Sequence, residues 1–200
     1  SMDESHRGLT VVSSNGSAMV AVLLGLPLPV TRAMIIRINL VTDGVCNVTI
    51  GVDPIHEEVL AQPPRPGEQG LVDRAMLICI SYLSLIMAAG TLGVFWSRLP
   101  EGHQHAQIMV FVTLAAFQWF NALNGRSENQ SVFHIGFWTN RWLLLGIAFV
   151  ATLQVLVIHT EIGQKAFGVT PLSLQNWGHA LLVASSTPVI EELRKRLISL

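Results

Sequence analysis

Long apolar stretches, separated by short polar segments, make up most of this 200-residue chain. About 20 apolar residues in succession are needed for a helix to cross a bilayer, so stretches of this length predict transmembrane helices. Six spans are expected, at residues 9–25, 30–50, 75–97, 106–124, 142–159 and 172–190. They follow a polar N-terminal segment, residues 1–8, and precede a charged tail, residues 191–200. The predicted fold class is an all-α membrane protein, a bundle of six transmembrane helices.

The connections between the spans predict the topology. Pro27 and Pro29 prevent a helix from continuing, so the first two spans are expected to form an antiparallel pair. Basic residues gather in alternate loops and at the C-terminal end: Arg65, Arg74, Arg126, Arg141, Arg194, Lys195 and Arg196. The opposite loops hold only Arg98 and Lys165. By the positive-inside rule, both termini are expected in the cytosol of a multi-pass integral membrane protein.

Composition supports this class. The chain is 50% hydrophobic and 12% charged, with a mean hydropathy of +0.50, whereas a soluble domain carries about 25% charged residues. The expected partner is the lipid bilayer. A net charge of −1 gives no basic field that would attract a nucleic acid.

Asp43 lies inside the second apolar stretch, where an ionised carboxylate costs about 2.5–3.5 kcal/mol on insertion scales. An acidic residue kept at such a place indicates a functional site. Asn39 and Thr42 precede it at spacings that put all three side chains on one helix face. Their oxygens are hard ligands that suit Ca²⁺ and other hard cations. The alternative is a polar cluster that only ties helices together.

Gly44 within this span and Gly51 directly after it weaken a regular helix there. Irregular backbone within a membrane is tolerated where it lines a polar cavity. The second helix is therefore expected to be broken at the ion site. Arg37, two residues before Asn39, has two interpretations: its side chain extends to the outer interface, or it lies beside the site and discourages a second ion.

Other polar residues favour simpler interpretations. His103 and His105 are expected as solvated residues of a short loop and not as metal ligands. The serines around Asn15 have no basic or acidic partner nearby in the sequence, which disfavours a hydrolase.

Several strings of residues resemble the C-terminal membrane half of P-type cation-transporting ATPases of the calcium-pump-like class. The most specific are residues 38–44, Ile-Asn-Leu-Val-Thr-Asp-Gly, which resemble the ion-binding sixth membrane helix of that family. The others are residues 13–16, 25–27, 51–54, 62–65, 121–124 and 127–131. Together they span about residues 9–198, which would be the family's fifth to tenth membrane helices.

The resemblance implies roles for particular residues. It puts four of them at cation-ligand positions, namely Asn15, Asn39, Thr42 and Asp43, and Gln118 is expected as a fifth ligand. Gln118 and Ala18 fall where two-site calcium pumps carry glutamates, and both departures remove a carboxylate. The resemblance therefore implies one site, which we expect to take Ca²⁺, with an acidic ligand from an earlier helix. Mn²⁺, Na⁺, K⁺ and H⁺ remain alternatives, because selectivity depends on the whole cavity.

The family phosphorylates an Asp in an Asp-Lys-Thr-Gly-Thr string, which does not occur in these 200 residues. By this resemblance the chain alone is not expected to hydrolyse ATP, and ATP and Mg²⁺ are expected to act only through N-terminal pump domains, its expected partners. Two functions follow. The chain is the membrane-embedded half that binds and translocates the cation, or it is a truncated, non-catalytic membrane protein that associates with or regulates a full-length pump.

Overall fold

The computed structural model of the protein describes residues 30–51, 74–124 and 140–198, so the predicted first span lies outside the described residues. Those residues form helices and no strand, which confirms the all-α prediction. In chain order the helices are α2 (Arg32–Arg37), the π-helix η1 (Ile38–Asp43), α3 (Gly44–Gly51), α5 (Arg74–Arg98), the 3₁₀-helix η2 (Leu99–Glu101), α6 (His103–Asn124), α8 (Arg141–His159), α9 (Glu161–Phe167), α10 (Leu174–Ala184) and α11 (Ser186–Ile198).

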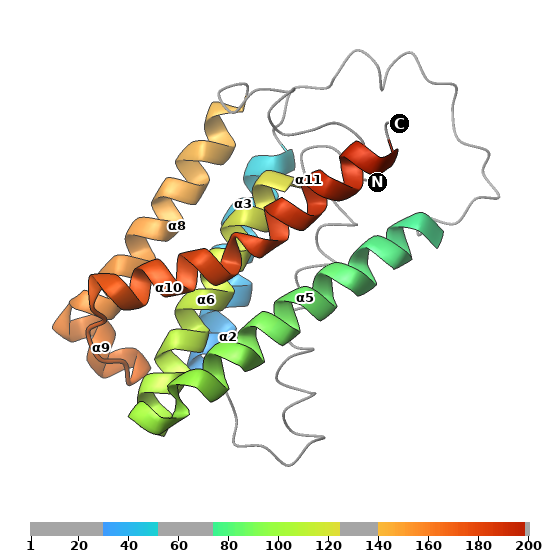
Figure 1. Ribbon diagram of the computed structural model, residues 1–200. Helices are drawn as coiled ribbons and strands as arrows, with labels where there is room; N and C mark the ends of the chain where they lie inside the picture. The colour runs from blue at the N-terminus through green and yellow to red at the C-terminus, as the bar shows by residue number, and fades with distance from the viewer. Residues whose placement is uncertain (1–29, 52–73, 125–139, 199–200) are drawn as a thin grey trace.

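Helix α6 forms the centre of the bundle (Figure 1). It contacts α3, α5, α8, α10, α11 and η1. In the most apolar stretch of each helix, 78% of α6 is buried inside the protein, compared with 22% of α5 and 28% of α8. The buried amides of Gln118, Asn121 and Asn124 explain this position, because polar groups are costly where they face lipid. The outer helices instead expose apolar side chains such as Leu85 and Leu145, which suit lipid.

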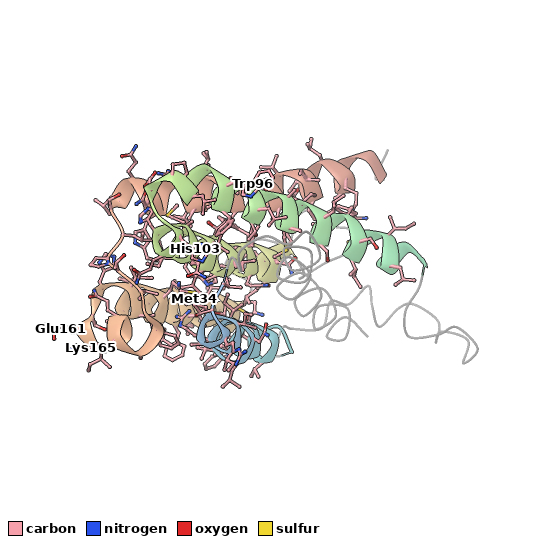
Figure 2. The ribbon with its side chains drawn as sticks, turned by 90° about the horizontal axis from the view of Figure 1, so that it is seen from below. Met34, Trp96, His103, Glu161 and Lys165 are labelled. Carbon is pink, nitrogen blue, oxygen red and sulfur yellow. The ribbon has the colours of Figure 1, made fainter. Side chains whose placement is uncertain are left out.

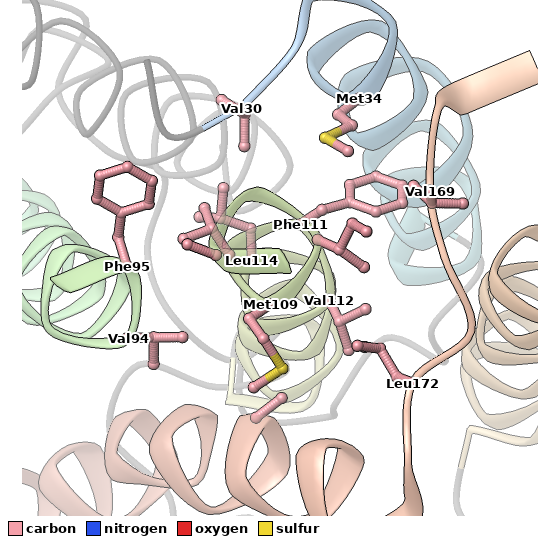
Figure 3. Close-up of a cluster of buried hydrophobic side chains, with 14 of the residues drawn as sticks. Val30, Met34, Val94, Phe95, Met109, Phe111, Val112, Leu114, Val169 and Leu172 are labelled. Atoms are coloured by element: carbon pink, nitrogen blue, oxygen red, sulfur yellow. The ribbon is translucent and has the colours of Figure 1, made fainter. Parts of the chain in front are cut away.

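The largest buried cluster surrounds the first half of α6 (Figure 3). Phe95 approaches from α5, Met34 from α2, and Leu172 from the segment that precedes α10. Phe111 and Met109 of α6 meet them and are fully buried. This cluster fixes α2, and therefore η1 after it, against α6.

Three stretches within the described residues are long and apolar enough to cross a membrane: Leu77–Glu101, His103–Asn124 and Arg141–His159. The second expected span is instead built from α2, η1 and α3, which follow one another without a gap.

The sixth expected span, residues 172–190, is not one continuous helix. Helix α10 ends at Ala184 and α11 begins at Ser186. Pro188 gives the reason, because it has no N–H to donate to the carbonyl of Ala184 and its ring clashes with that carbonyl in a regular helix. Helix α11 continues through the charged tail to Ile198.

Polar contacts hold α11 to α5 and α6. The Tyr82 hydroxyl on α5 donates to the Glu191 carboxylate, which also binds Arg194 at 2.6 Å between Nη2 and Oε1. Lys195 Nζ donates to the backbone carbonyl of Asn124 at the end of α6, 3.2 Å away. Burial lowers the pKa of the Lys195 ammonium, although the Glu191 and Glu192 charges oppose this shift. The last helix is therefore fixed to the end of the central one.

The segment expected as a loop, residues 160–171, contains the short helix α9. Thr160 caps it by accepting a hydrogen bond from the N–H of Gly163, with 3.3 Å between Oγ1 and N. Gly168 ends it in the left-handed conformation, at φ 64°. A Thr before the helix and a Gly after it were the sequence signals for this element.

Gly163→Ala is expected to destabilise the protein by about 1–3 kcal/mol, as overpacking typically does. A Cβ at Gly163 would lie 2.4 Å from the backbone oxygen of Val157, so the turn between α8 and α9 must move. Gly178→Ala is the matched control. Its Cβ would meet nothing within 4 Å, and alanine favours a helix by about 0.5–1 kcal/mol over glycine. Thermal unfolding in one detergent measures both, and equal midpoints would contradict the predicted overlap at Gly163.

Candidate cation site

The backbone of the candidate site is the π-helix η1, which lies between α2 and α3. Its hydrogen bonds join residues five apart instead of four, so its turn is wider than that of an α-helix. Asn39 and Asp43, four residues apart, therefore lie on nearly the same face. Short π-helical segments inside α-helices occur frequently at functional sites. The expected break in the second helix takes this form, and not that of an unwound segment.

The structure describes the predicted ligands to different extents. Thr42 is 1% exposed, and its Oγ1 has no hydrogen-bond partner among the described residues. Asn39 is half-buried. Asp43 is the last residue of η1, but its side chain lies outside what the structure describes, and so does the whole of Asn15.

Gln118 lies on α6, against which η1 packs. It is 3% exposed, and its Nε2 has no hydrogen-bond partner within the described ranges. Buried polar atoms are normally hydrogen-bonded, so the missing hydrogen bonds of Thr42 Oγ1 and Gln118 Nε2 require an explanation. A bound ion or water would supply the missing partner of the Thr42 hydroxyl, whereas Nε2 of Gln118 only donates and would pair with a water. The structure thus buries two of the predicted ligands on helices that touch.

Arg37 settles one of the alternatives left by the sequence. It is 5% exposed, so its side chain does not extend to the interface, and that interpretation is wrong. Its Nη1 donates to Oε1 of Gln154, which is fully buried on α8. Its guanidinium carbon lies 5.3 Å from the ring centre of Phe111 on α6, within range of a cation–π interaction. A positive charge is therefore held inside the bundle, next to the residues of η1.

Gln154 was not identified from the sequence. The signal was present, because it is a polar residue in the middle of the apolar stretch 142–159. Its Nε2 and the Nη2 of Arg37 have no hydrogen-bond partner in the described part of the chain.

The other side of this region is closed by α3 and α8. Asn140 caps α8 by accepting from the N–H of Leu143 at 2.9 Å, and its Nδ2 donates to the carbonyl of Thr49 on α3 at 3.2 Å. Farther along α8, Gly146 lies directly against Thr49, since a Cβ there would come 2.7 Å from Thr49 Cγ2. The segment that follows η1 is thereby held in place against α8.

The described histidines are His103, His105, His159 and His179. Within the described ranges, no three His, Cys, Asp or Glu side chains come close enough together to hold a metal ion. His103 and His105 belong to the first turn of α6 and not to the loop expected for them. His105 is half-buried and pairs with Glu101 at 3.1 Å.

Residues 27–197 match the family described as "Cation transporting ATPase, C-terminus". The chain belongs to this family. Membership of the cation-transporting ATPase C-terminal family and the three long apolar helices of the described residues together support an integral membrane protein with several spans. The resemblance inferred from residues 38–44 is thereby confirmed.

Segments of several longer proteins are similar to this chain. The human protein "Calcium-transporting ATPase type 2C member 1" is 30% identical over 198 residues, which cover 98% of this chain and 21% of the relative. The rat protein "Calcium-transporting ATPase type 2C member 2" is 30% identical over 189 residues, 93% of this chain and 20% of the relative. "Calcium-transporting ATPase 1" of Bacillus cereus is 31% identical over 193 residues, 88% of this chain and 22% of the relative. The chain therefore spans about a fifth of the length of these curated relatives.

Proposed function

We propose that this chain is the cation-binding and translocating membrane part of an ATP-driven calcium pump. The observation that carries the proposal is the π-helix η1, which packs against α6, in a chain whose relatives are named as calcium-transporting ATPases. The proposed ligands are Asn15, Asn39, Thr42, Asp43 and Gln118. ATP and Mg²⁺ act only through other domains of the pump, and both ends of this chain face the cytosol.

A single Ca²⁺ site follows from the charges available. Asp43 is the only acidic residue among the five proposed ligands, and Gln118 is a neutral amide. The buried Arg37 adds a positive charge on the α6 and α8 side of η1. A second divalent ion would have to enter against this charge without a carboxylate to offset it. One ion, with a further acidic ligand from an earlier helix, satisfies the site.

The proposal is tested by the size and activity of the native product. An antibody against residues 191–200 is expected to detect, in native membranes, a band several-fold heavier than 21.8 kDa. Vesicles from those membranes are then expected to take up radioactive Ca²⁺ only when ATP and Mg²⁺ are present, and the antibody should co-purify this activity. A single band near 21.8 kDa would contradict the proposal and favour the regulator, which would be recovered bound to a complete pump.

A further inference from the structure

One end of the bundle gathers four histidines. The last turn of α5, the start of α6, the end of α8, and α9 with the start of α10 meet there (Figure 1). We call it the histidine end, defined by His103, His105, His159 and His179. On the proposed topology this end faces away from the cytosol.

His179 of α10 is joined to Arg98 at the end of α5, with 2.8 Å between its Nδ1 and the Nη2 of Arg98. A guanidinium only donates hydrogen bonds, so Nδ1 must be the unprotonated acceptor nitrogen. Arg98 also binds Glu101 of η2 at 2.6 Å. A proton on Nδ1 would remove the acceptor and place a second cation against Arg98.

Trp177 of α10 makes the same kind of contact with the end of α8. Its indole Nε1 donates to Nε2 of His159 at 3.3 Å, and the two rings stack with their centres 6.4 Å apart. An indole N–H cannot accept a hydrogen bond, so this imidazole nitrogen is also unprotonated. The charged groups of the adjoining α9, Glu161 and Lys165, are exposed and pair with each other at 3.7 Å. Figure 2 shows both at the outer edge of the bundle, directed away from it.

Asn176 supplies the third contact of α10. Its Nδ2 lies 3.4 Å from Nε2 of His105 on α6, which accepts the hydrogen bond only when unprotonated. Protonated, the same nitrogen donates to Glu101, whose Oε2 is 3.1 Å away. A proton on Nε2, in the neutral or the charged ring, therefore changes His105 from an acceptor for Asn176 into a donor to Glu101. His103, in contrast, is exposed and contacts the ring of Phe95 on α5.

We propose that the first half of α10 is docked by three neutral imidazoles, those of His105, His159 and His179, and is released when they are protonated. Each of the three contacts uses a lone pair on a ring nitrogen, so a proton on that nitrogen removes it. Only the Asn176 amide can turn its oxygen toward the new N–H and restore a hydrogen bond. The released state binds more protons than the docked state, so docking weakens as the pH falls. The second half of α10 stays packed on α6 through Ala180 and Ala184, which are fully buried.

Hydrogen exchange tests this proposal on the full chain in lipid nanodiscs. After correction for the intrinsic pH dependence of exchange, amides of residues 174–180 are expected to open about 10-fold or more readily at pH 5.5 than at pH 7.5. Residues 108–117 of α6 provide the internal reference and should not change. Equal protection of residues 174–180 at both pH values would overturn the proposal.

The decisive variant replaces His105, His159 and His179 by Gln, which offers an acceptor oxygen but does not titrate. Its α10 is expected to stay docked at pH 5.5. His103→Gln is the matched control and should keep the full pH response. If the triple variant does not fold, each single Gln substitution should reduce the response by a part of its size. Single variants that all keep the wild-type response would contradict the proposal, as would a folded triple variant that does so. Neither the readout nor the outcome depends on the transported cation.

Discussion

Asp43→Asn is expected to abolish the cation-activated phosphorylation of the intact pump to which we assign this chain. The substitution preserves the size of the side chain and replaces a carboxylate by an amide, so the site loses the negative charge on which its affinity for Ca²⁺ depends. We expect the apparent affinity to fall on the order of 100-fold or more. Folding should survive, because an uncharged residue within the membrane costs less than the about 2.5–3.5 kcal/mol of an ionised carboxylate. Ca²⁺-dependent transfer of labelled phosphate from ATP measures the effect.

Glu161→Gln is the matched control for Asp43→Asn. It removes one carboxylate in the same way, but from an exposed position on α9, where Glu161 pairs only weakly with Lys165. The control should phosphorylate with unchanged Ca²⁺ dependence. Normal activation of the Asp43→Asn pump at unchanged affinity would instead refute the assignment of Asp43 as a ligand.

Arg37→Gln is expected to raise the apparent affinity for divalent cations by on the order of 10-fold or more. Two unit charges 4 Å apart interact by about 4 kcal/mol at an effective dielectric constant of 20, and the energy falls only inversely with distance. A charge three times farther from a divalent ion still contributes about 2–3 kcal/mol. Gln removes the charge but keeps an amide that can contact Gln154. Equilibrium binding of radioactive Ca²⁺ to the intact pump measures affinity and stoichiometry, which should stay at one ion.

Arg37→Lys separates the charge from the contact. It keeps the positive charge but loses the guanidinium that donates to Gln154 and lies over Phe111. Its affinity should remain near that of the wild type. If Lys and Gln at this position raise the affinity equally, the contact between α2 and α8 matters, and the charge does not.

The lengths of the apolar stretches made the long helices predictable. Residues 75–97 and 142–159 were expected as helices, and α5 and α8 occupy Arg74–Arg98 and Arg141–His159. The prediction succeeds because a helix that spans a bilayer must be both long and nearly free of charge, and both properties are visible in the sequence. α6 begins three residues before the expected start, since its first turn is polar. When the first turn of a helix is polar, the apolar stretch begins later than the helix itself, so the start of the helix is predicted too late.

Features that depend on which helices pack together could not be read from the sequence. Arg37 and its partner Gln154 are 117 residues apart, and nothing in either segment indicates the other. The three histidine contacts of α10 join it to α5, α6 and α8, so their common role arises only in the folded bundle. The candidate site was predicted in part. The string at residues 38–44 pointed to the segment that forms η1, whereas the burial of Gln118 on the adjacent α6 is known only from the structure. Asn15 and the Asp43 side chain remain predictions.

The central position of α6 has a consequence for how the chain enters a membrane. A helix that carries Gln118, Asn121 and Asn124 in its second half is a poor candidate for release into lipid by itself. Only Leu99–Glu101 and Gly102 separate it from the strongly apolar α5, so the two can enter as a hairpin that α5 helps to insert. Of the other helices that contact α6, η1 and α3 precede it in the chain, whereas α8, α10 and α11 are synthesised later. During biogenesis the amide-bearing part of α6 therefore stays next to α5 or at the insertion machinery until α8 and α10 have been synthesised and pack against it.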